Sequence, residues 1–71
     1  MSKQQAILTA ALDIVTPDAF RAYERLNSAD DTETTRNQWR DTLMRRTGIT
    51  RVRARQVVAK AIRIRRGEGR G

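Results

Sequence analysis

The chain has 71 residues, and neither cysteine nor histidine occurs among them. Disulfides and zinc sites, which stabilise many very small domains, are therefore excluded. A chain of this length buries only about 60% of the surface that it exposes when unfolded. The fold must therefore depend on one hydrophobic core, and we expect a single domain of marginal stability.

The same absence narrows the possible functions. Without cysteine or histidine the chain has no thiol nucleophile and no imidazole base, and we find no phosphate-binding loop or paired acid-base arrangement. The acidic residues could suggest a metal site or a catalytic pair, but their spacing follows the preferences of helix caps and first turns. These residues are Asp18, Glu24, Asp30, Asp31 and Glu33. The sequence predicts no enzyme, no metal and no cofactor.

Helical periodicity recurs along the chain, and no segment alternates with the period of a strand. Residues 3–15 form the first predicted helix, with a face of Ile7, Leu8, Ala11, Leu12 and Val15. Thr16, Pro17 and Asp18 are typical of a helix start. We expect the second helix to bury Ala19, Phe20, Tyr23 and Leu26 and to end at residues 27–30.

The third helix is predicted to begin among the capping residues at 30–33 and to end near Thr47, with Gly48 as its C-cap. Trp39, Leu43 and Met44 supply its core side chains; a partner-binding role for Trp39 is the alternative. The fourth helix should run from Thr50 or Arg51 to about Arg65. One of its faces is apolar (Ala54, Val57, Val58, Ala61, Ile62), and the opposite face carries Arg53, Gln56, Lys60 and Arg63.

These patterns predict an all-α domain over residues 1–66, a small bundle of about four short helices. Residues 67–71, which contain three glycines, are expected to form a disordered tail. The longest apolar stretch, residues 6–15, contains Thr9 and Asp13 and is too short to span a membrane or to form a signal core. We therefore expect a soluble protein, and the absence of cysteine favours the cytoplasm.

Charge is unevenly distributed along the chain. Residues 1–34 hold three cations against six acids, whereas residues 35–71 hold twelve cations against two acids, so the net charges are −3 and +10. Thirteen of the fifteen cations are arginine, whose planar guanidinium binds phosphates and carboxylates through two donors at once. The second half is therefore expected to contact a polyanion: a nucleic acid, an anionic membrane or an acidic protein. The apolar face of the fourth helix lacks Trp, Phe and Leu, which disfavours the membrane.

The segment 43–62, LMRRTGITRVRARQVVAKAI, resembles a helix-turn-helix motif. Such a motif needs a glycine in a left-handed turn, an apolar residue between the helices and a capping Ser or Thr, and Gly48, Ile49 and Thr50 follow in that order. Met44 departs from the pattern, because the family usually has a small residue there. The alternative is a plain helical hairpin in which Gly48 is an ordinary C-cap.

The resemblance implies a set of nucleic-acid-binding residues. In such a motif the beginning of the second helix enters the major groove, where Arg and Gln side chains recognise guanine and adenine. The residues facing base edges would be Thr50, Arg51, Val52, Arg55 and Gln56. The residues near phosphates would be Arg45, Arg46, Arg53 and Lys60, and Arg63 extends the same cationic face.

Size, arginine content and the lack of catalytic groups also resemble the small early regulators made by bacteriophages, which act in the host cytoplasm. The sequence thus favours transcription regulation through DNA binding. Two alternatives remain open. The same arginines could dock onto an acidic surface of the host RNA polymerase or its initiation factor, or the chain could be an RNA-binding accessory protein.

Overall fold

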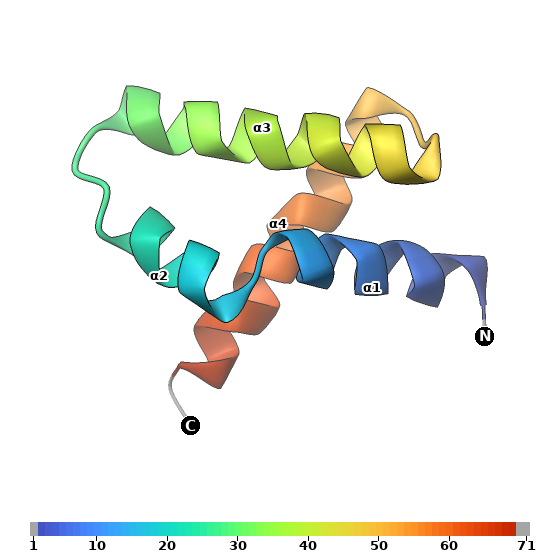
Figure 1. Ribbon diagram of the computed structural model, residues 1–71, viewed down its shortest axis with the longest axis horizontal. Coiled ribbons are helices and arrows are strands. Elements are labelled where there is room, and N and C mark those ends of the chain that lie inside the picture. Colours follow the sequence, from blue (N-terminus) through green and yellow to red (C-terminus); the bar gives the residue numbers. More distant parts are fainter. Residues whose placement is uncertain (1, 70–71) are drawn as a thin grey trace.

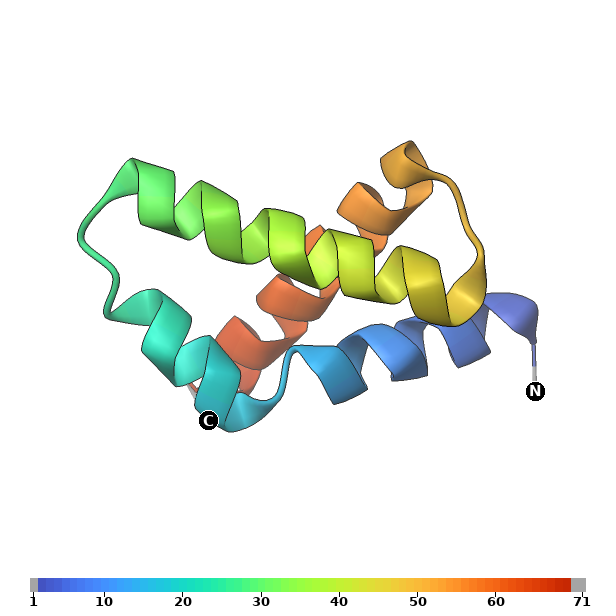
Figure 2. The same cartoon turned by 45° about the horizontal axis from the view of Figure 1, so that its top comes forward.

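Residues 2–69 are described by the structure, a computed structural model, and they form four α-helices and no strand. These are α1 (Lys3–Ile14), α2 (Pro17–Glu24), α3 (Ala29–Thr47) and α4 (Arg51–Glu68). The predicted all-α bundle is confirmed. Helices α1 and α3 run side by side in opposite directions, α2 closes one end, and α4 crosses behind them as a second layer (Figure 1). The turned view in Figure 2 shows the same two layers.

Each helix begins with a hydroxyl side chain that accepts a hydrogen bond from the backbone N–H three residues later. Thr16 accepts from Ala19 at 3.1 Å, and Thr50 accepts from Arg53 at 3.2 Å, both at predicted starts. Helix α3 begins earlier than expected, because Ser28 rather than a residue of 30–33 is its N-cap. Asp30 and Asp31 instead occupy its first turn, where carboxylates favour the positive end of the helix dipole.

Two helix ends also differ from the prediction. Helix α2 stops at Glu24, and Leu26 packs against the core from the following turn. Helix α4 continues through Gly67 and Glu68, so the tail expected from residue 67 is wrong at these two positions; Arg70 and Gly71 lie outside the described residues. The extension is stabilised by an ion pair between Arg65 and Glu68, whose atoms lie 2.9 Å apart on the last turn.

The core contains twelve buried side chains, and each belongs to an apolar face predicted above. Trp39 is only 9% exposed and packs 5.2 Å from the ring of Tyr23, so it is a core residue. The Tyr23 hydroxyl accepts a hydrogen bond from Arg36 at 3.0 Å. The buried residues are Ile7, Ala11, Val15, Phe20, Tyr23, Trp39, Leu43, Ala54, Val57, Val58, Ala61 and Ile62.

Helix α4 has one face in this core and its opposite face in solvent. Five of its side chains are buried, and they contact all three helices of the other layer. Lys60, Arg63 and the other polar residues of the opposite face are exposed. Within residues 2–69, neither α4 nor any other helix combines the length and apolar character required to cross a membrane.

Candidate functional site

The turn between α3 and α4 consists of the three residues singled out in the sequence. Gly48 has φ 74° and ψ 11°, a left-handed conformation, and its N–H donates to the Met44 carbonyl at 2.8 Å. Ile49 is half-buried against the core, and Thr50 caps α4. Met44 is also only partly buried, at the edge of the core. The chain therefore reverses within three residues, and α4 lies across α3.

The outer face of α4 is strongly cationic. Five residues of this face are exposed, and none of their side chains makes a hydrogen bond or ion pair within residues 2–69. These five residues, which we call the free cations, are Arg51, Arg53, Arg55, Lys60 and Arg63. No acid occurs between residues 51 and 67. The other predicted contact residues of this region, Thr50, Val52 and Gln56, are exposed too, and Val52 is 67% exposed.

Several other arginines are occupied by contacts within the fold. Arg65 donates to the Val15 and Leu12 carbonyls, both at 2.8 Å, and only 15% of its side chain is exposed. Arg66 lies 3.4 Å from the Glu24 carboxylate and 5.9 Å above the centre of the Phe20 ring. These residues hold α4 against α1 and α2. The structure thus separates the arginines that stabilise the fold from the free cations.

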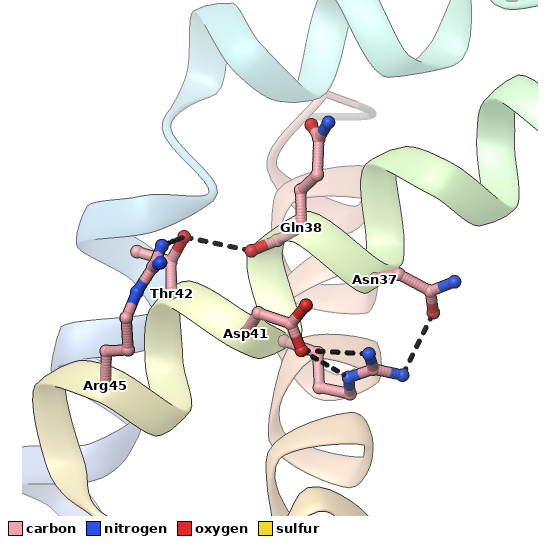
Figure 3. Close-up of polar contacts among 6 residues, drawn as sticks. Asn37, Gln38, Asp41, Thr42 and Arg45 are labelled. Atoms are coloured by element: carbon pink, nitrogen blue, oxygen red, sulfur yellow. Dashed lines mark hydrogen bonds and ion pairs between the residues drawn. The ribbon is translucent and has the colours of Figure 1, made fainter.

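Two predicted contact residues, Arg45 and Arg46, differ from the free cations because their side chains have partners within the fold. Arg46 pairs with Asp13 of α1 at 3.0 Å. Arg45 donates to the Thr42 hydroxyl at 3.4 Å, and this hydroxyl donates to the Gln38 backbone carbonyl at 2.9 Å (Figure 3). Both residues are exposed on α3, and neither lines the α1–α4 or α3–α4 groove described below. Arg46 instead lines a different hollow, together with Arg65 and residues of α1.

Several shallow hollows border α4, and two of them contain Arg53, Arg55 and Lys60. The α1–α4 groove is lined by Ser2, Gln4, Gln5, Leu8, Arg53, Gln56, Val57, Lys60 and Arg63. The α3–α4 groove is lined by Glu33, Arg36, Asn37, Arg40, Arg55, Val58 and Ala59. Gln4, Gln5, Arg36 and Arg40 were not predicted as site residues, because only the packing of the helices brings them beside α4.

The α3–α4 groove has mixed charge. Arg40 donates to the Asp41 carboxylate at 2.8 and 3.0 Å and to the Asn37 side chain at 3.2 Å (Figure 3). Only 14% of the Arg40 side chain is exposed, and Glu33 also lines this groove. Much of its positive charge is therefore balanced by neighbouring carboxylates.

Comparison with known proteins adds no further residue to this site. No protein family model, no curated protein and no solved structure matches the chain. The function is therefore inferred from the side chains of α4 and of the two grooves beside it.

Proposed function

We propose that the chain is a small, non-enzymatic transcription regulator that binds DNA through the outer face of α4. The observation that carries this proposal is the set of five free cations. Arg51 and Arg55 are four residues apart, and Lys60 and Arg63 are three apart, so like charges are neighbours on the helix surface. Such pairs destabilise an isolated helix, but they attract a polyanion such as the DNA backbone.

The turn before α4 supports a helix-turn-helix mode of binding. The left-handed Gly48, the half-buried Ile49 and the capping Thr50 are consistent with the three roles that such a turn requires. Beyond the turn, Arg55 and Gln56 are exposed, and Arg and Gln side chains recognise guanine and adenine in the major groove. The exposed Val52 methyl groups suit contact with a thymine methyl.

Direct binding to labelled duplex DNA tests this proposal. Fluorescence anisotropy would first be measured with a random-sequence duplex, and selection from a random library would then identify a preferred site. Arg55→Gln should weaken binding to that site, whereas the matched variant Arg25→Gln should leave it unchanged. Both arginines are exposed, and neither side chain has a partner within residues 2–69, but Arg25 follows α2, outside both grooves.

Affinity capture from a bacterial lysate, with and without nuclease, separates DNA binding from the alternatives. Loss of the captured material after DNase treatment is the expected result. Tight capture of RNA polymerase or its initiation factor that survives nuclease would replace DNA binding by protein docking, provided that the purified chain binds DNA only loosely, with a Kd of about 10⁻⁴ to 10⁻⁶ M. Loss after RNase alone would assign the surface to RNA.

A further inference from the structure

The α1–α4 groove differs from the α3–α4 groove in its charge. Three of the five free cations line it, namely Arg53, Lys60 and Arg63, and no acidic residue does. Its other wall is the beginning of α1, which contributes the neutral side chains of Gln4 and Gln5. This groove therefore has a positive charge that no neighbouring carboxylate balances.

The position of α1 was not expected from the charge of its half of the chain. Residues 1–34 have a net charge of −3, but the first acid is Asp13, near the end of α1. Lys3 is the only charged side chain in residues 3–12. In Figure 1 the first turn of α3, which carries Asp30 and Asp31, lies at the end of the molecule opposite to the start of α1. The acidic half thus presents a non-acidic segment to α4.

The groove is also long enough to contact several phosphates of one DNA strand. Arg53 and Arg63 are ten residues apart on one helix, which corresponds to about 15 Å along its axis. Lys60 lies between them, so three cations follow the groove over a distance that spans several phosphates of one strand. Gln side chains commonly donate to phosphate oxygens, and Gln4 and Gln5 face this row from α1.

We infer that the α1–α4 groove holds the phosphodiester backbone of one strand of duplex DNA, and that the first turn of α1 is part of the DNA-binding surface. This inference depends on the proposed function and deepens it.

The α3–α4 groove, on the other side of α4, is less suitable for a phosphate strand. It is lined by Glu33 and by Arg40, whose charge is paired with Asp41. A second hollow on that side also has no acidic lining residue; it is lined by Tyr23, Arg36, Ala59, Ile62, Arg63 and Arg66. Arg36 donates to the Tyr23 hydroxyl and Arg66 pairs with Glu24, so Arg63 is the one free cation that lines this hollow among residues 2–69. The α1–α4 groove therefore holds more of the free cations than either hollow on the other side.

The double variant Gln4→Glu/Gln5→Glu tests the inference. It places two carboxylates beside the phosphate strand with almost no change in side-chain shape. Like charges a few ångströms apart repel each other even in water, so affinity for a random-sequence duplex at about 0.1 M salt should fall by about tenfold. Both positions lie in the first turn of α1, where acids stabilise a helix, so the variant should unfold at an equal or higher denaturant concentration. Weaker binding would therefore not result from a damaged fold.

The control is Gln38→Glu, which makes the same chemical change once, at an exposed position of α3 that lines neither groove, so the effects are compared per added carboxylate. It should reduce affinity by less than about twofold, since exposed charges beyond a Debye length of about 10 Å are screened. Lys60→Gln should lower the slope of log K against log salt concentration by about 1. Equal effects of the α1 double variant and the Gln38→Glu control would overturn the inference.

The inference and the proposed function fail in different ways. If the wild-type chain binds no duplex DNA, both are wrong. If it binds duplex DNA and Arg55→Gln weakens the preferred site, but the α1 double variant binds as the wild type does, only the groove assignment is wrong. We expect the chain to bind single-stranded DNA and RNA with lower affinity than duplex DNA. Higher affinity for single-stranded DNA or for RNA would also overturn the assignment of the groove to duplex DNA.

Discussion

Arg65 donates from its Nε to the carbonyl oxygen of Val15, fifty residues earlier in the chain, at 2.8 Å. Its Nη2 donates to the Leu12 carbonyl, also at 2.8 Å, and its Nη1 pairs with Glu68. Helix α1 has no basic residue in its last turn. A cation from α4 therefore occupies the C-terminal end of α1, where the dipole and the unsatisfied carbonyls favour positive charge.

Arg65→Met should consequently lower the free energy of unfolding by about 1 to 3 kcal/mol, because two carbonyl oxygens lose charged donors. The control is Arg63→Met, at an exposed position whose side chain has no partner within residues 2–69, which should change stability by less than about 0.5 kcal/mol. Urea unfolding followed by the fluorescence of Trp39, the single tryptophan, measures both. Equal stability of the two variants would contradict a stabilising role for Arg65.

Gly48→Ala should destabilise the fold by about 1 kcal/mol, and Gly48→Val by at least as much. A Cβ at Gly48 would meet no atom within 4 Å, so the cost comes from its φ of 74° and not from a clash. Gly67→Ala is the matched control, because that glycine lies in α4 with equally open surroundings. Alanine there should leave stability unchanged or raise it slightly. Urea unfolding measures both variants, and an equal loss of stability in Gly48→Ala and Gly67→Ala would contradict the conformational role of Gly48.

Duplex DNA binding should depend steeply on salt. If about six phosphates are contacted, the affinity should fall by about 10³ between 50 and 200 mM salt, because each neutralised phosphate releases counterions. Anisotropy titrations at several salt concentrations give the slope directly. A flat response would be incompatible with binding through the free cations.

The two sides of the outer face should affect binding differently. Arg55→Ala is expected to reduce discrimination between the preferred site and a random duplex by about 1 to 3 kcal/mol, because a base contact is lost. Lys60→Ala should weaken both duplexes equally, since phosphate contacts are independent of sequence. Competition titrations with the two duplexes measure this difference. Equal loss of discrimination in both variants would argue against base recognition by Arg55.

The local structure of this protein could be predicted from the sequence. Thr16 and Thr50 mark two helix starts, and Gly48 marks the end of α3, because caps depend on residues within one turn of the chain. The apolar faces were also correct, since helical periodicity alone determines which side chains share a face. The start of α3 was predicted too late because Ser28, Asp30 and Asp31 are all good capping residues, and only the backbone geometry selects among them.

The tertiary structure decided which contacts each arginine makes. In the sequence Arg63, Arg65 and Arg66 are similar cations near the end of one helix. In the part of the chain that the structure describes, Arg63 is exposed and has no partner, whereas Arg65 donates to backbone carbonyls at the end of α1 and Arg66 pairs with Glu24. The helical turn of 100° per residue points these side chains in different directions, and the elements that they meet come from distant parts of the chain.

The net charges of the two halves of the chain were likewise not sufficient to predict which side chains lie beside the free cations. The sequence determined that the second half is basic, and composition alone determined that neither disulfides nor histidine chemistry takes part. Only the packing of α1 against α4 placed Gln4 and Gln5 beside Arg53 and Lys60, in a groove that no acid among residues 2–69 lines. Periodicity specifies the face that a helix buries, but the neighbour across a groove depends on how separate helices cross, which contacts distant in sequence determine.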